Sequence, residues 1–174
     1  MKSGLRKNPD LKYRKWIVAL GILAVTCYSS ANWYQLLLIH GDSMYPAYHD
    51  LQFVILDKHT GVYTYGDVIA FWCTGLDALL VKRIAACPGD QVWIQGERLY
   101  VNGKESQVFP ADLVFADAGI ADTALLLGKD EYFVIGDQTA KSKDSRFREV
   151  GCVREEDIRG RVLPETVPFF RGGK

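Results

Sequence analysis

Hydrophobic and polar positions divide the chain into an apolar stretch near its beginning and a long region of short, interrupted apolar segments. Residues 16–39 contain no charged side chain. A helix that crosses the hydrocarbon core of a bilayer needs about 20 residues. Because polar residues are frequent in the second half of the stretch, we place the predicted transmembrane helix at 16–33 and expect a folded domain from residue 34 onwards.

The region after residue 34 has the periodicity of short strands separated by turns, without a long helical face. Asn102-Gly103 predicts a two-residue hairpin turn, because both positions favour positive φ. Residues 109–127 are less regular and are expected to form a loop with a helical turn. The predicted strands are 35–40, 51–56, 67–73, 79–86, 91–94, 98–101, 131–135 and a terminal strand with an extended tail over 158–170. The fold class is therefore mostly β, a compact domain of short antiparallel strands.

Charge is distributed unevenly along the chain, although its 21 basic and 21 acidic residues cancel. Six of the basic residues lie within positions 1–15, and no further Lys or Arg occurs before Lys58. A basic flank on one side of a membrane span orients the N-terminus towards the cytoplasm. We therefore expect a cytoplasmic segment at 1–15, an anchor at 16–33 and an extracytoplasmic domain at 34–174. The balanced total charge gives no reason to expect a nucleic-acid partner.

A cleaved secretory signal is the alternative interpretation of the N-terminus. The basic flank, the apolar core and the small residues at 29–31 also fit a signal with a cleavage site. The length of the apolar stretch and the aromatic residues Tyr28, Trp33 and Tyr34 at its far end favour a retained anchor.

Cysteine and histidine spacing gives no sign of a metal site. Cys27, Cys73, Cys87 and Cys152 form no CxxC pair, and the chain has no HExxH motif. These spacings argue against a zinc ribbon and a zinc-dependent hydrolase. We expect no metal and no cofactor, and the sequence leaves open whether any cysteines form a disulfide.

Ser43 is the candidate nucleophile, in the segment HGDSMYP of residues 40–46. A glycine before the serine and a proline after it favour a tight, exposed bend, which can present a hydroxyl beside backbone N–H groups. The same residue types are common in ordinary turns, which is the simpler interpretation. An α/β-hydrolase elbow is excluded, because Tyr45 stands where its second glycine would be.

Lys82 is the candidate general base. In the predicted strand 79–86 its side chain shares a face with Leu80 and Ile84, which leads the amine into apolar surroundings. Desolvation disfavours the ammonium form and lowers the pKa, so that a lysine can act as a base near neutral pH. The side chain of Arg83 likewise shares its strand face with apolar residues. A guanidinium stays charged, however, so Arg83 is expected to pair with an acid. A surface lysine on an edge strand is the alternative for Lys82.

Four ordered segments of the chain resemble the type I signal peptidase family. They are GDSMYP at 41–46, GDVI at 66–69, KRI followed by PGD within 82–90, and GD followed by SKDSR within 136–146. The last segment follows a predicted strand and alone is typical of a solvated loop. The four together cover nearly all of residues 40–150, and their order is far more specific than any one of them.

The resemblance implies a membrane-bound endopeptidase with a signal-peptidase-like β-domain on the outer face of the cell membrane. It would remove signal peptides from exported preproteins after small residues, at A-x-A sites. Ser43 would attack the scissile carbonyl to form an acyl-enzyme, and Lys82 would take its proton. The backbone N–H of Ser43 would supply part of the oxyanion hole. Gly41 stands where some members carry a serine that completes that hole, so the resemblance does not identify the second hydrogen-bond donor.

Supporting residues follow from the same resemblance. Ser142 matches the position that orients the lysine, and Asp144 and Arg146 match an ion pair that holds the loop, with Arg83 as a further partner. Lys141 stands where many members have asparagine, and an amine that faced Lys82 would lower its pKa further. The small pockets for substrate side chains would be walled by Ile39, Met44, Tyr48, Leu80 and Val81.

The expected partners are secretory preproteins, bound as an added extended strand, and membrane lipid, and the chain is expected to be a monomer. A dedicated pilin-maturation peptidase of conjugative transfer would share the serine and lysine and the anchor. From another class, an inactive anchored β-domain would only bind extended peptides.

Overall fold

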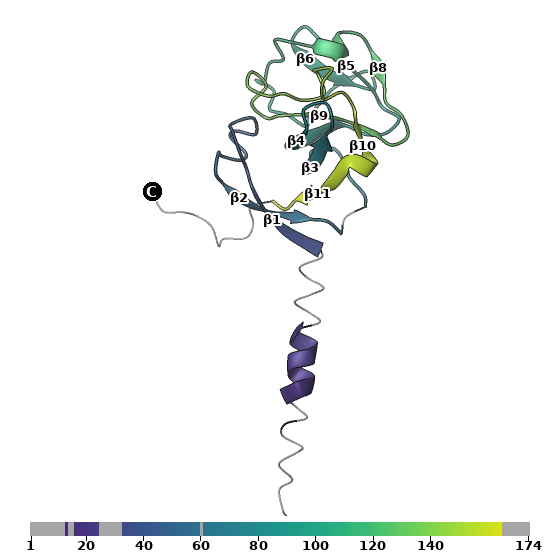
Figure 1. Cartoon of the computed structure of the whole chain (residues 1–174). Helices are drawn as coiled ribbons and strands as arrows, with labels where there is room; N and C mark the ends of the chain where they lie inside the picture. The colour runs from purple at the N-terminus through teal and green to yellow at the C-terminus, as the bar shows by residue number, and fades with distance from the viewer. Residues whose placement is uncertain (1–12, 14–15, 25–32, 60, 165–174) are drawn as a thin grey trace, which may run out of the picture.

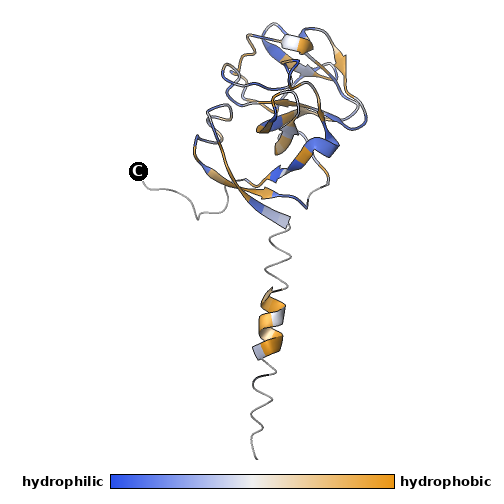
Figure 2. Ribbon diagram, viewed as in Figure 1, coloured by the Kyte–Doolittle hydropathy of each residue, from blue (hydrophilic) through white to orange (hydrophobic). Residues whose placement is uncertain are grey.

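The computed structural model describes residues 13, 16–24, 33–59 and 61–164 (Figure 1). Residues 16–24 form a helix with exposed apolar side chains, which Figure 2 shows as mainly hydrophobic. Among the described residues, no helix has both the length and the apolar character needed to cross a membrane. The predicted anchor at 16–33 therefore remains a prediction, because residues 25–32 lie outside the described part of the chain.

The described part of the domain contains two antiparallel sheets. The larger sheet has seven strands in the order β1-β2-β11-β3-β4-β9-β10, and the smaller has four in the order β7-β6-β5-β8. Figure 1 shows the smaller sheet at the end of the domain far from β1. The strands of the larger sheet are β1 (Tyr34–Leu38), β2 (Phe53–Asp57), β3 (Val68–Cys73), β4 (Ala78–Ala86), β9 (Glu131–Ile135), β10 (Val153–Arg154) and β11 (Ile158–Val162). Those of the smaller sheet are β5 (Gln91–Gln95), β6 (Arg98–Val101), β7 (Lys104–Glu105) and β8 (Leu125–Leu126).

The mostly β, antiparallel fold predicted from the sequence is confirmed. The Asn102-Gly103 turn connects β6 and β7, with φ values of 52° and 81°. The loop predicted at 109–127 contains a 3₁₀ helix, η1 (Gly119–Asp122), together with the short strand β8. A second 3₁₀ helix, η2 (Glu155–Asp157), precedes β11.

Two ends of predicted strands differ from the prediction by two residues. The first strand, expected at 35–40, ends at Leu38 as β1. Leu51 has a φ of 60°, and its N–H bonds to the carbonyl of Ile39 across a turn, so β2 begins only at Phe53 and not at residue 51. The apolar run from residue 51 onwards gave no sign of this left-handed position. The terminal strand expected within 158–170 is β11, which ends at Val162, and residues 165–170 of the expected tail lie outside the described residues.

Strand β4 connects the parts of the hydrophobic core. Ala85 and Ala86 lie in the cluster beneath the smaller sheet. Val81 packs against a second cluster near β1 and β2. Ile84 belongs to a third cluster with residues of β3 and β9. Because neighbouring side chains of a strand point to opposite faces, one long strand can fix all three clusters, and its residue Lys82 is held between them.

Gly160 lets β11 lie between β2 and β3. The register of β11 against β3 shifts between Ile158 and Gly160. A Cβ atom at position 160 would lie 2.4 Å from the carbonyl oxygen of Asp57. This close approach leaves no room for a side chain, so the glycine is required by packing.

We expect Gly160→Ala to lower the free energy of unfolding by about 2–3 kcal/mol, because the clash is with backbone and a strand must shift to relieve it. Chemical denaturation followed by tryptophan fluorescence measures the change. Gly61→Ala is the matched control, since a Cβ there would meet nothing within 4 Å. Equal effects of the two substitutions would contradict this account of β11.

Candidate active site

Ser43 lies in a tight turn between β1 and β2. The N–H of Tyr45 donates to the carbonyl of Asp42 at 3.0 Å, and the N–H of Tyr48 donates to that of Met44 at 2.9 Å. Gly41 precedes the turn with a φ of 80°, and its N–H donates to Asp50 at 2.7 Å. Met44 is buried and anchors the turn in the core, whereas Ser43 is half-buried. The serine hydroxyl is thus held on a fixed backbone while still accessible.

Lys82 reaches this turn from the middle of β4. Its side chain is only 3% exposed, and its Nζ lies 2.8 Å from Ser43 Oγ and 2.9 Å from the carbonyl oxygen of Val81. Burial lowers the pKa of Lys82 to about 8, while the carboxylates of Asp144 and Asp137 act in the opposite direction. Desolvation is the larger effect, and the amine is therefore neutral in a large fraction of molecules near pH 8.

A buried ion pair shapes the loop after β9. Arg146 Nε and Nη2 donate to the two carboxylate oxygens of Asp144 at 2.8 and 2.9 Å. Asp144 also accepts from the N–H of Gly136 at 3.1 Å, and Arg146 donates to the carbonyls of Thr139 and Asp117 at 2.8 and 3.2 Å. Both charged side chains are at most 2% exposed. The pair therefore closes loop 136–146 on itself and ties it to the 117 region.

Gly136 brings this loop against Ser43. A Cβ at this position would lie 2.2 Å from Ser142 Oγ and 2.5 Å from the carbonyl oxygen of Ser43, so only glycine fits. The N–H of Gln138 donates to that same carbonyl at 3.0 Å. Ser142 is 4% exposed, and its hydroxyl has no hydrogen-bond partner among the described residues. The structure thus places Ser142 beside the site without a hydrogen bond to Lys82.

Arg83 forms its own ion pair with Asp137 and does not join the buried pair of Asp144 and Arg146. Its Nε and Nη2 donate to the two carboxylate oxygens at 2.7 and 2.6 Å, and its Nη1 donates to the carbonyl of Gly66 at 2.8 Å. The predicted Arg83 link to the buried pair is therefore wrong. Sequence reasoning missed Asp137, although an acid directly after Gly136 in the same segment was the available signal.

Lys141 does not act on Lys82. Its Nζ lies 3.3 Å from a carboxylate oxygen of Asp42, and both side chains are more than half exposed. The lowered pKa of Lys82 comes from burial and not from a second amine. The Asp42–Lys141 pair instead joins the nucleophile turn to loop 136–146 at the surface, where an ion pair adds little stability.

Four of the five predicted pocket residues come together. Ile39, Met44 and Tyr48 are buried in one apolar cluster, and Val81 packs against it. Leu80 lies in another cluster, with Ile69, Phe71 and Ile84. Leu80 and Val81 are neighbours in a strand, so their side chains point to opposite faces and cannot both wall one pocket. Leu80 is therefore separated from the other four.

The outer edge of β4 is open next to Lys82. Strand β9 pairs with β4 only at Arg83, Ile84 and Ala86. Residues 78–82 pair with β3 on their other side and have no strand on this edge in the part of the chain that the structure describes. An unpaired edge can accept an extended peptide through backbone hydrogen bonds.

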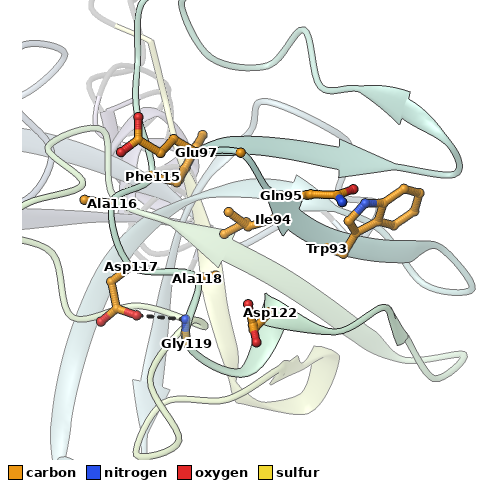
Figure 3. Close-up of a pocket in the computed structure, with 11 residues that line it drawn as sticks. Trp93, Ile94, Gln95, Glu97, Phe115, Ala116, Asp117, Ala118, Gly119 and Asp122 are labelled. Carbon is orange, nitrogen blue, oxygen red and sulfur yellow. Dashed lines mark hydrogen bonds between the residues drawn. The ribbon is translucent and has the colours of Figure 1, made fainter.

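Other features of the described residues lie apart from this site. A cavity of about 840 Å³ is lined by residues of β5, of the turn that follows it and of the segment 115–122, including Glu97, Asp117 and Asp122 (Figure 3). None of its lining residues belongs to the segments around Ser43 and Lys82. Within the described ranges no three His, Cys, Asp or Glu side chains are grouped as a metal ion would require. Cys73, Cys87 and Cys152 are free thiols.

Comparisons with known proteins agree over almost the whole chain. The model of a family described as signal peptidase, peptidase S26, matches residues 12–165. Signal peptidase I S of Bacillus subtilis (strain 168) is 30% identical over 94% of this chain and 92% of its own length. Signal peptidase IB of Staphylococcus aureus (strain Mu50) is 28% identical over 89% of this chain and 90% of its own. A crystal structure of a signal peptidase I from Enterococcus faecalis V583 is 25% identical with a TM-score of 0.47, covering 59% of this chain and 97% of that one.

Proposed function

Because the chain belongs to the signal peptidase family, peptidase S26, we propose that it is a membrane-bound endopeptidase that cleaves signal peptides from exported preproteins through Ser43 and Lys82. The observation that carries the proposal is the 2.8 Å approach of Lys82 Nζ to Ser43 Oγ. A nucleophile and its base must lie within hydrogen-bond reach of each other. These two residues do so although 39 positions separate them.

The chemistry follows from the protonation state of Lys82. A neutral amine accepts the proton of the Ser43 hydroxyl as Oγ attacks the scissile carbonyl. The resulting ammonium then donates this proton to the departing amine, which leaves an ester between Ser43 and the signal peptide. Lys82, neutral again, takes a proton from water, and the hydroxide formed attacks the ester. As the bond between the acyl carbon and Oγ breaks, the Lys82 ammonium returns its proton to Oγ, which releases the signal peptide as a carboxylic acid and regenerates both residues. Protons and bonds balance over the cycle without a further group.

The backbone N–H of Ser43 supports an oxyanion hole. It forms no hydrogen bond within the residues that the structure describes, so it remains available to the developing oxyanion. Gly41 has no side chain to contribute and a Cβ there would meet nothing within 4 Å. The second donor must come from backbone or from another residue.

Substrate binding is supported by the open edge of β4 and by the apolar cluster below it. A signal peptide that adds as a strand along residues 78–82 would bring its scissile carbonyl to Ser43. The cluster of Ile39, Met44, Tyr48 and Val81 lies where side chains just before the cleaved bond would enter. Bulky residues packed in this way favour small side chains in the substrate, as A-x-A sites have.

Membrane anchoring is supported by the helix at 16–24 and the basic residues before it. Its apolar side chains are exposed; Trp16, for example, is 69% exposed. We propose that segment 16–33 holds the domain at the outer face of the membrane, with residues 1–15 in the cytoplasm. In this arrangement the enzyme works as a monomer on preproteins that arrive through the same membrane, with no role for nucleic acid.

Ser43→Ala and Lys82→Ala should each abolish cleavage of a preprotein by the full-length chain in detergent or liposomes. The members of such a pair act as a unit, so each single loss should reduce kcat by about 10⁴-fold or more. Gel analysis of precursor and mature protein measures this. Cleavage of several unrelated A-x-A precursors separates general signal peptide processing from a dedicated pilin-maturation peptidase. Undiminished cleavage by the Ser43 variant would rule out Ser43 as the nucleophile, whereas a parent chain that binds the precursors without cleaving them would support a domain that only binds peptides.

The value of kcat/KM should rise with pH through about 8 and level off above it. Lys82 has its pKa lowered by burial to about 8, and the neutral form, which is the base, is populated above that value. A pH–rate profile with a short peptide substrate locates the midpoint. Lys141→Ala should leave the midpoint in place, since Lys141 contacts Asp42 at the surface. A midpoint near the ordinary lysine value of 10.5 would contradict the role of burial.

Ser142→Ala should lower kcat/KM by about tenfold or more with little change in the free energy of unfolding. Its hydroxyl lies beside the site and has no partner in the described residues, so the positioning of Lys82 during the reaction is its available role. Ser145→Ala is the matched control, because Ser145 Oγ accepts from the buried N–H of Val134 at 2.9 Å. This control should lose about 1–3 kcal/mol of stability and little activity. The reverse pattern would remove Ser142 from the mechanism.

A further inference from the structure

A groove of about 520 Å³ adjoins the candidate active site at the nucleophile turn. We name it the leaving-side groove. Most of its wall is apolar. It is lined by the nucleophile turn at 45–47, by Arg83, Asp137 and Gln138, and by Val108, Phe109, Pro110, Asp112 and Leu113.

Each of the three segments that build the active site continues directly into this wall. Tyr45 and Pro46 follow Ser43 by two and three residues, and Arg83 follows Lys82. Gln138, which also lines the groove, donates its N–H to the carbonyl of Ser43 at 3.0 Å. The groove is therefore an extension of the site, unlike the larger cavity in Figure 3, whose wall shares no residue with these segments.

The register of β4 gives the groove its place along a bound substrate. Val81 and Arg83 project from the same face of the strand, about 7 Å apart at roughly 3.3 Å per residue. Val81 packs with the pocket for the side chains before the cleaved bond, and Arg83 lines the groove. Lys82, between them, contacts Ser43. Because β9 occupies the edge of β4 from Arg83 onwards, an extended chain with its acyl part at Val81 would leave the strand edge beside Ser43, where the groove offers a path for its other part.

The lining of the groove determines which chain segment it favours. The charges of Arg83 and Asp137 neutralise each other, because two guanidinium nitrogens donate to the two carboxylate oxygens at 2.7 and 2.6 Å. Leu113 and Pro46 provide apolar surface, and Asp112 is exposed at the wall. The groove thus suits apolar side chains and neighbouring positive charge, and disfavours a carboxylate beside Asp112.

We propose that the leaving-side groove binds the first three residues of the mature protein, on the carboxyl side of the cleaved bond, and that Asp112 and Leu113 select among them. This inference rests on the proposed function, because it takes Ser43 as the point of cleavage. It adds a specificity site for the part of the substrate that leaves first, next to the pocket for small side chains on the other part.

The test uses the purified full-length chain in detergent micelles and peptides that share one A-x-A site and one signal sequence. The peptides carry Leu, Lys or Asp at the second mature position, and one further peptide ends as an amide after the first mature residue. For the parent, kcat/KM should be higher with Leu and Lys than with Asp. Asp112→Lys should shift the Lys-to-Asp ratio of kcat/KM towards Asp by about two- to fivefold, as expected for one exposed charge pair.

Matched variants make the test specific. Asp122→Lys makes the same charge change at an exposed acid of the other cavity, and it should leave the ratio unchanged. Leu113→Ser should lower kcat/KM for the Leu peptide about fivefold or more and leave the truncated peptide unaffected. Equal ratios for parent, Asp112→Lys and Asp122→Lys, with cleavage intact, would overturn the groove assignment alone. Failure of the parent to cleave any peptide would overturn the proposed function and the groove together.

Discussion

The buried ion pair of Asp144 and Arg146 is the interaction on which the arrangement of the site depends. Two charges at most 2% exposed are costly to remove from water and are tolerated only when their hydrogen-bonding capacity is used. Here Asp144 also binds the N–H of Gly136, and Arg146 binds the carbonyl of Thr139 in the same loop and that of Asp117 in a distant segment. The loop that results can approach Ser43 closely enough for Gln138 to bond its carbonyl. The pair acts together with the Arg83–Asp137 contact and the bonds between Ser145 and Val134, which hold the two ends of the same loop.

Burial isolates Asp144 and Arg146 from water, and it also determines the pKa of Lys82. Water is excluded from its amine, which lowers the pKa, while the nearby carboxylates of Asp144 and Asp137 raise it. Each carboxylate is already satisfied by an arginine. Desolvation is the largest of these effects and prevails over the two carboxylates.

Much of the fold could be predicted from sequence because its strands are local patterns. The Asn102-Gly103 turn and the alternation that buries Lys82 needed only neighbouring residues. The contact of Ser43 with Lys82 could not be predicted from either local pattern, because it depends on how β1, β2, β3 and β4 close around the core. The pairing of these two residues was predicted only from the order of the four segments that resemble the signal peptidase family. The pairing of Arg83 with Asp137 depends on how loop 136–146 lies against β4, which the sequence did not define. The separation of Leu80 from Val81, by contrast, follows from the alternation of a strand and could have been predicted.

The open edge of β4 has a consequence for turnover. Its backbone groups at residues 78–82 would recognise an extended main chain and cannot tell an intact precursor from the signal peptide already cut from it. A released signal peptide keeps its small residues and its unpaired backbone, so it would compete for the same edge. Continuous processing would then require removal of the product, by the surrounding lipid or by degradation, and the pace of that clearance would limit the enzyme as much as the chemistry at Ser43.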